Sequence, residues 1–125
     1  MVGLKPKVLV LDDDLLTLEL YSRELVDNYQ VVTSESVEET RQYFKTFKFD
    51  VLVIEPAVNG GEGWGLLGEI HSFLNPPVVV LCSVEDNRKV GLEQGVHAFV
   101  VKPVLPTALH ALLDHIVAKR SSLNA

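Results

Sequence analysis

Acidic side chains and a lysine follow three apolar runs of this chain, at the points where buried strands would end. The acidic triplet 12–14 closes the run KVLVLDDD, Glu55 closes FDVLVIE, and Lys102 closes HAFVVKP. Carboxylate oxygens suit a hard cation such as Mg²⁺, and a lysine ammonium suits a phosphate oxygen. If the strands are parallel neighbours, these groups meet at one edge of a sheet, and the chemistry that they predict is metal and phosphate binding.

The elements that must position these groups follow from the hydrophobic pattern. Short apolar runs alternate with longer amphipathic segments, which is typical of βαβ units around a parallel sheet. The expected strands cover residues 8–11, 30–33, 50–54, 78–82 and 98–101, and the expected helices cover about residues 15–26, 36–47, 63–73, 85–94 and 106–120. Right-handed crossovers favour a three-layer, doubly wound α/β sandwich with a five-stranded parallel sheet. Residues 1–125 are predicted to form one domain with its core in about residues 5–120.

Local patterns add detail to these elements. Ser36 followed by Glu39 predicts a capping box at the start of the second helix. Gly91 lies inside the fourth helix and weakens it by about 1 kcal/mol relative to alanine. The sequence GGEG at 60–63 predicts a tight turn with positive φ, because it lacks the spacing of a nucleotide-binding loop. The residues expected on the inner face of the first helix, which Asp14 would cap, are Leu15, Leu18, Tyr21, Leu25 and Val26.

Composition limits the classes of function. The chain has 125 residues, a net charge of −6 and a sequence pI of about 5.1, which argues against direct binding to nucleic acid. No run has the length and apolar character of a signal peptide or a membrane span, so we expect a cytoplasmic protein without membrane contact. Cys82 is the single cysteine, which excludes an internal disulfide and suits a reducing compartment.

The motifs together resemble the receiver domain of two-component response regulators. The resemblance rests on VLVLDDD, on FDVLVIE followed by GGEG, on PPVVVLCS and on GVHAFVVKP, and it covers about residues 5–120. It implies a flavodoxin-like fold and a role in phosphorelay signal transduction rather than a stand-alone enzyme activity. The partners that it implies are a histidine kinase, a phosphotransfer protein or an output domain.

The resemblance also implies roles for single residues. Lys102 corresponds to the lysine that pairs with a phosphate oxygen, and its peptide bond with Pro103 would be cis. Phe99 corresponds to the aromatic residue whose rotation reports the state of the site. With Mg²⁺ as the candidate cofactor, the residues that fall on the family's metal positions are Asp12, Asp13, the phosphoacceptor position Glu55 and the backbone carbonyl of Ala57.

Two positions depart from the family pattern. Glu55 stands where receivers have the phosphoaccepting aspartate, and its extra carbon moves the carboxylate by ~1.5 Å. Cys82 stands where they have a threonine or serine hydroxyl, and a thiol is a weak hydrogen-bond donor; Ser83 carries a hydroxyl one residue later. Because positioning dominates phosphoryl transfer, we expect an atypical receiver, or pseudo-receiver, that is not phosphorylated conventionally. Our hypothesis is a permanent Glu55–Lys102 pair that partly mimics a phosphate.

Several alternatives stay open at this stage. Glu55 could accept phosphate with the help of Mg²⁺, as a true receiver. The fold could instead serve a flavodoxin-like binder of flavin or another small molecule, although three acids after the first strand would repel a phosphate. Cys82 could be a redox sensor, but a small buried residue at a strand end is the favoured interpretation. The face of the segments 85–94, 98–101 and 106–120 is the family's usual dimer or effector surface, and we expect it to be the contact surface here.

Overall fold

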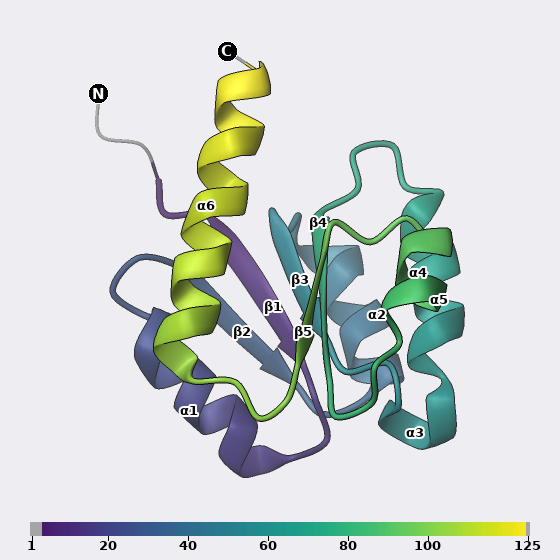
Figure 1. Ribbon diagram of the computed structural model, residues 1–125. Helices are drawn as coiled ribbons and strands as arrows, with labels where there is room; N and C mark the ends of the chain where they lie inside the picture. The colour runs from purple at the N-terminus through teal and green to yellow at the C-terminus, as the bar shows by residue number, and fades with distance from the viewer. Residues whose placement is uncertain (1–3, 125) are drawn as a thin grey trace.

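The central sheet has five parallel strands. The computed structural model describes the backbone of residues 4–124 and the side chains of residues 4–120. The strands are β1 (Lys7–Leu11), β2 (Gln30–Ser34), β3 (Val51–Ile54), β4 (Val78–Ser83) and β5 (Ala98–Val101). Their order across the sheet is β2-β1-β3-β4-β5, and every neighbouring pair is parallel (Figure 1). The predicted doubly wound α/β sandwich is confirmed.

Helices cover both faces of this sheet. On one face lie α1 (Leu15–Leu25) and α6 (Pro106–Asn124), and on the other lie α2 (Val37–Thr46), α4 (Gly63–His71) and α5 (Arg88–Glu93) (Figure 1). A single turn, α3 (Val58–Gly61), follows β3 at the edge of the sheet where the strands end. In the part of the chain that the structure describes, no helix is both long and apolar enough to cross a membrane.

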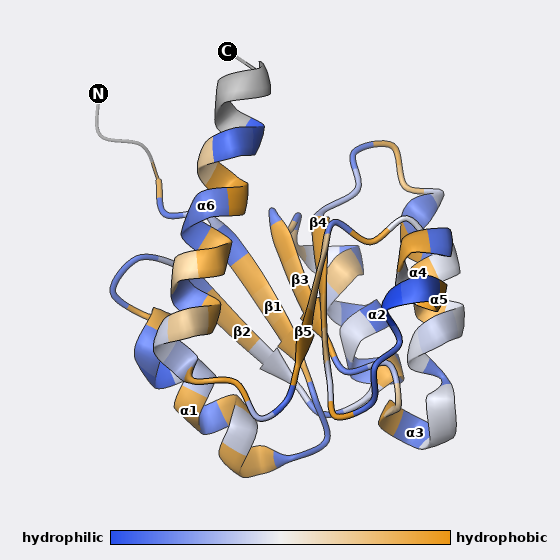
Figure 2. Cartoon of the chain, viewed as in Figure 1, coloured by the Kyte–Doolittle hydropathy of each residue, from blue (hydrophilic) through white to orange (hydrophobic). Residues whose placement is uncertain are grey.

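The core has two layers because each strand sends alternate side chains to opposite faces. Leu9 and Leu52 pack towards α2 and α4, whereas Val8 and Val51 pack towards α1 and α6. Both faces are therefore apolar, and the strands are hydrophobic along almost their whole length (Figure 2). Such strands are typical of a parallel sheet that is buried on both sides.

The inner face of α1 was predicted correctly in its middle and wrongly at its ends. Leu18, Tyr21 and Leu25 are buried, as expected. Leu15 and Val26 are 63% and 52% exposed. Leu15 is the first residue of α1 and Val26 follows its last residue, so both lie at its ends. Helical spacing alone does not show where the neighbouring sheet ceases to cover a helix.

Several helical elements also differ from the prediction. The turn α3 was not expected, α5 begins three residues later than residue 85, and α6 continues four residues beyond residue 120. The predicted cap of α2 is confirmed, since the Ser36 hydroxyl accepts the N–H of Glu39 at 3.1 Å. Gly91 has a packing role: an added Cβ would lie 2.6 Å from the Cδ1 of Leu81. Only glycine lets α5 approach β4 this closely.

Candidate functional site

Parallel pairing brings the ends of β1 and β3 together. Leu11 and Ile54 are register partners, and the N–H of Glu55 donates to the Leu11 carbonyl at 2.9 Å. Asp12 and Glu55, the next residue of each strand, therefore lie side by side. Lys102 comes from the end of β5, where its N–H donates to the Ser83 carbonyl at 2.8 Å. The predicted meeting of acids and lysine at one sheet edge is confirmed.

The ammonium of Lys102 contacts both acids. It hydrogen-bonds Asp12 Oδ2 and lies 3.5 Å from Glu55 Oε1. The three side chains are only 14%, 4% and 8% exposed, for Lys102, Asp12 and Glu55 respectively. Burial by itself would lower the pKa of Lys102, but the bond to Asp12 and the charges of both acids raise it above its ordinary value. The lysine therefore stays charged. The peptide bond between Lys102 and Pro103 is cis, as predicted.

Backbone groups complete the contacts of the two acids. Asp12 Oδ1 accepts the N–H of Asp14 at 2.9 Å, and Glu55 Oε2 accepts the N–H of Ala57 at 3.2 Å. Each carboxylate thus turns one oxygen to Lys102 and the other to the loop that follows its own strand. All four carboxylate oxygens have a partner, which removes most of the cost of burying them.

The other two acids of the triplet lie outside this cluster. Asp13 and Asp14 are exposed. Asp14 precedes α1, but its carboxylate accepts the hydroxyl of Thr17 at 2.6 Å and makes no cap to a backbone N–H. The bond from Thr17 lowers the pKa of Asp14. Asp12 therefore contributes to the pocket, whereas the structure places Asp13 at the surface beside it.

Two of the predicted metal ligands, Asp12 and Glu55, have protein partners for their carboxylates in this arrangement. Among the residues that the structure describes, no group of three or more His, Cys, Asp or Glu side chains is arranged to hold an ion. The ammonium of Lys102 lies between Asp12 and Glu55, where a cation would neutralise both. The carbonyl of Ala57 accepts the N–H of Gly61 at 3.1 Å, inside the α3 turn. The donor atoms are oxygens of the type that Mg²⁺ prefers. In this arrangement, the carboxylates of Asp12 and Glu55 bind the ammonium of Lys102.

The sulfur of Cys82 faces the layer under α1. Its Sγ lies 3.6 Å from the hydroxyl of Tyr21, and both residues are buried. Burial raises the pKa of the Cys82 thiol, and the opposing effects of Tyr21 and Lys102 are smaller. A thiol with a raised pKa is a poor nucleophile at neutral pH, which favours the structural interpretation of Cys82 over a redox sensor. The sequence contained no pattern that linked Tyr21 with Cys82.

Ser83 and Phe99 contact residues outside the cluster of Lys102, Asp12 and Glu55. The Ser83 hydroxyl is buried and accepts the N–H of Glu85 at 3.3 Å, in the turn after β4. Phe99 is partly buried against the α2–α4 layer, and the guanidinium of Arg88 in α5 lies 5.7 Å from its ring centre. This cation–π contact joins α5 to β5.

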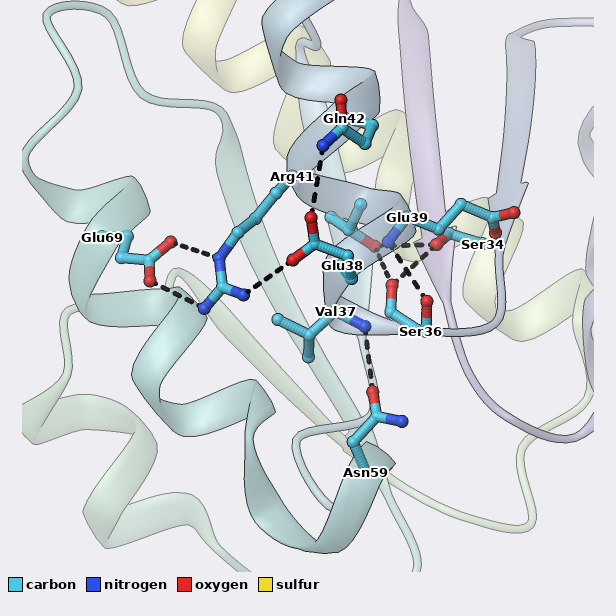
Figure 3. Close-up of polar contacts among 10 residues, drawn as sticks. Ser34, Ser36, Val37, Glu38, Glu39, Arg41, Gln42, Asn59 and Glu69 are labelled. Atoms are coloured by element: carbon cyan, nitrogen blue, oxygen red, sulfur yellow. Dashed lines mark hydrogen bonds and ion pairs between the residues drawn. The ribbon is translucent and has the colours of Figure 1, made fainter.

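The loop after Glu55 and the helix α4 are both joined to α2 by contacts that the sequence analysis missed. Asn59 has a positive φ of 52°, and its side-chain oxygen accepts the N–H of Val37 at 2.9 Å (Figure 3). Arg41 in α2 makes two hydrogen bonds with Glu69 in α4, at 3.0 and 2.8 Å (Figure 3). The dipeptide Asn59-Gly60 is a turn pattern that could have indicated the positive φ, but not its distant partner.

Fold and site together define a class of protein. The chain is a doubly wound α/β domain whose three site residues, two buried acids and one lysine, follow three different strands at the carboxyl edge of the sheet. This edge is where open α/β sheets bind their ligands.

Comparison with known sequences names the family. The profile of the response regulator receiver domain matches residues 8–114, so the chain belongs to this family. A probable transcriptional regulator ycf27 of Guillardia theta is 30% identical over 118 residues, which are 92% of this chain and 46% of that protein. The ycf27 protein of Cyanidium caldarium is 28% identical, over 94% of this chain and 48% of that protein. The chain thus spans about half the length of these relatives.

Solved structures agree with this assignment at the level of the fold. A CheY-like receiver domain protein from Methanospirillum hungatei JF-1 superposes with a TM-score of 0.87 at 20% identity, over 95% of this chain and 98% of that one. The response regulator DrrB of Thermotoga maritima, an OmpR/PhoB homologue, gives 0.83 at 24% identity, over 94% and 54% of the two chains. The receiver domain of DrrB has also been solved in a BeF₃-activated form, which gives 0.82 at 24% identity, over 92% and 99%.

Membership in the receiver family indicates a general role in two-component signalling. Response regulators act in two-component systems, where they interact with histidine kinases and output domains, and their receivers typically bind Mg²⁺ at the phosphorylation site. How far this chain follows that pattern depends on the residues of its own site.

Proposed function

We propose that this receiver domain transmits information through protein contacts without conventional phosphorylation of its acceptor position. The observation that carries the proposal is the buried cluster of Lys102, Asp12 and Glu55, in which the lysine already has two carboxylate partners. In this proposal the domain is cytoplasmic and has no stand-alone enzyme activity.

The geometry of Glu55 supports the proposal. Its carboxylate reaches ~1.5 Å further from the backbone than an aspartate would, and there it meets Lys102. The same lysine would be needed to stabilise a transferring phosphoryl group, and positioning of such groups accounts for most of the catalysis of phosphoryl transfer. The Glu55 carboxylate therefore lies beside Lys102, where a phosphoryl oxygen would lie in a phosphorylated receiver. It carries one negative charge, whereas a phosphoryl group carries about −1.5 to −2.

The second departure, at Cys82, supports it independently. The thiol faces Tyr21 in the buried layer, so β4 has no hydroxyl at this position to bind a phosphoryl oxygen. Ser83 carries the next hydroxyl, and that group is bonded in the turn to Glu85. The hydroxyl that the family has at this position is thus replaced by a thiol, and the nearest hydroxyl is engaged elsewhere.

The contact surface that we propose is the face of α5, β5 and α6. Five large apolar side chains are exposed on these elements and the loops beside them: Val84, Val90, Leu92, Val101 and Leu105. A histidine kinase, a phosphotransfer protein, an output domain or a second copy of the chain are the partners of this class. Exposed apolar side chains are frequent on such interaction surfaces.

The alternative of flavin binding gains no support from the site. Asp12 and Asp13 follow β1, where a flavin phosphate would need hydrogen-bond donors, and two carboxylates repel a phosphate. We expect the purified protein to be colourless.

Phosphorylation can be tested directly with acetyl phosphate and Mg²⁺, followed by intact mass. We expect no phosphoryl adduct on the natural chain. The matched control is the double variant Glu55→Asp with Cys82→Thr, which restores both family residues and should gain one phosphoryl group. A stable adduct on Glu55 of the natural chain would instead show that glutamate serves as the acceptor, and the proposal would be wrong.

A further inference from the structure

A second concave region lies at the opposite edge of the sheet, where β4 and β5 begin. Its volume is about 700 Å³, and it lies between α6, the start of β5 and the loop that joins α4 to β4. In Figure 1 this is the side of the sheet towards which the second half of α6 runs. A volume of this size lies in the range of small-molecule sites. We call this region the α6 groove.

The α6 groove has an apolar part and a cationic part. Its lining residues are Asn75, Pro76, Val78, His97, Ala98, Leu112, His115, Ile116, Lys119 and Arg120. Leu112 and Ile116 are one helical turn apart on α6 and line the groove beside Val78 and Ala98. The next turn of the helix brings Lys119 and Arg120. Positions 112 and 120 are eight residues apart, which corresponds to about 12 Å along a helix.

The charge of Arg120 is held in place without being neutralised. Its two terminal nitrogens donate to the carbonyls of Asp50, at 2.9 Å, and Pro76, at 3.3 Å. None of the ion pairs found among residues 4–120 includes Arg120 or Lys119. Carbonyls fix the direction of a guanidinium but leave its full positive charge, and the planar fork has five donors in all. What distinguishes these two cations is their place beside an apolar surface, since both line the groove next to Leu112 and Ile116.

His97 also lines the groove and adds a hydrogen-bond donor. Its Nδ1 accepts the N–H of Val79 at 3.0 Å, so the proton of the neutral ring is on Nε2. Burial, together with the charges of Arg120 and His71, lowers the pKa of His97. Arg120 and His97 both line the groove. An anion bound between them would interact favourably with both.

We propose that the α6 groove binds a small organic acid, with its carboxylate at Arg120, Lys119 and His97 and its apolar body against Val78, Leu112 and Ile116. The cations favour an anion, and the apolar part favours one with a hydrocarbon body over a fully hydrated one such as acetate or inorganic phosphate. The length of the groove matches an acid of about eight carbons, since an extended chain of that size spans on the order of 10 Å. The site is independent of the proposed role of Lys102 and Glu55, because it lies at the other edge of the sheet.

The test is a titration of the ¹⁵N-labelled chain with octanoate, followed by two-dimensional NMR. We expect saturable shifts centred on the amides of Val78, Ala98 and Ile116, with little change at Asp12 or Glu55. Each fully buried methylene contributes about fourfold in affinity, so octanoate should bind at least tenfold more tightly than butanoate. The neutral analogue octanamide should bind more weakly than octanoate, and the pKa of His97 should rise when octanoate is bound.

Two matched variants test the charge. Lys119→Gln should weaken octanoate binding by about twofold to fivefold, as expected for a partly exposed ion pair. Lys89→Gln removes the same charge from α5 and should leave the affinity unchanged. Equal binding of acetate and octanoate, equal effects of the two variants, or shifts centred away from the α6 groove would each overturn the proposal. Binding of octanamide as tight as that of octanoate would show an apolar groove without a role for the cations, and would overturn it too.

Discussion

Replacing Lys102 by methionine should reveal how much of the fold depends on the buried cluster. Methionine keeps a flexible side chain of similar length and removes the ammonium. Asp12 and Glu55 would then face one another without a cation, while their backbone partners, the N–H groups of Asp14 and Ala57, remain. We expect Lys102→Met to be strongly destabilised at neutral pH.

The magnitude follows from the distances and the burial. At 3.5 Å, the attraction between Lys102 and Glu55 is about 5 kcal/mol with an effective dielectric constant of about 20. The bond to Asp12 adds to this, and the cost of desolvating the ammonium offsets part of both. Removing one partner of a buried pair typically costs about 3–5 kcal/mol, because an uncompensated charge is left behind. We expect a loss in this range, which is a large fraction of the ~5–15 kcal/mol that stabilises a small domain.

The loss should depend on pH in a defined way. Because the folded pKa of Lys102 is raised above 10.5, its stabilising effect is complete below its unfolded pKa and is lost as pH rises through the folded value. The difference between the natural chain and Lys102→Met should therefore be constant between about pH 6 and pH 9. It should shrink in acid, where protons neutralise the carboxylates.

The assay is urea unfolding followed by circular dichroism at several pH values. The matched control is Lys89→Met, which removes an exposed lysine of α5 and should change the stability by less than about 0.5 kcal/mol. If Lys102→Met itself does not fold, adding Mg²⁺ should restore folding, since a cation can then take the place of the ammonium. A loss below about 1 kcal/mol at pH 7 would refute the view that the cluster is a tightly coupled buried unit.

Three further predictions concern the scaffold around the site. Ser36→Ala removes the cap of α2 and should cost about 1 kcal/mol in urea unfolding, whereas an unchanged midpoint would show that the hydrogen bond to Glu39 is not needed. Gly91→Ala places a Cβ 2.6 Å from Leu81 and should cost about 1–3 kcal/mol by thermal unfolding, although alanine is the better helix former; a stabilised variant would show that α5 can move away freely. Cys82, buried and with a raised pKa, should react with iodoacetamide at pH 8 only as fast as the domain unfolds, so rapid alkylation of the folded chain would contradict its structural role.

The sequence predicted the site better than it predicted the contacts within the site. Apolar runs that end in Asp12, Glu55 and Lys102 were enough to place these residues at one edge, because parallel strands must deliver their carboxyl ends together. The expected pair of Glu55 and Lys102 is present at 3.5 Å, but the sequence did not indicate that Asp12 makes the hydrogen bond to the same lysine. Such a choice depends on side-chain reach across neighbouring strands, which a one-dimensional pattern does not contain.

The contacts that the sequence missed all join distant segments. The Asn59–Val37 hydrogen bond and the Arg41–Glu69 pair connect residues at least 22 positions apart. Gly91 appeared to be a weakness of a helix, and the structure shows that it is required by the side chain of Leu81. Helix propensity gives the free-energy cost of a glycine within its helix. The close packing of that helix against β4 can be seen only in the structure.

The most direct test of the central claim is a crystal structure of the natural chain grown with Mg²⁺ and beryllofluoride, the phosphoryl analogue with which the DrrB receiver was activated. We predict that the ammonium of Lys102 remains between Asp12 and Glu55 and that no beryllofluoride is bonded to Glu55. Beryllofluoride on Glu55, with Lys102 turned towards its fluorine atoms and Mg²⁺ held by Asp12 and Asp13, would contradict the proposal that this receiver works without phosphorylation.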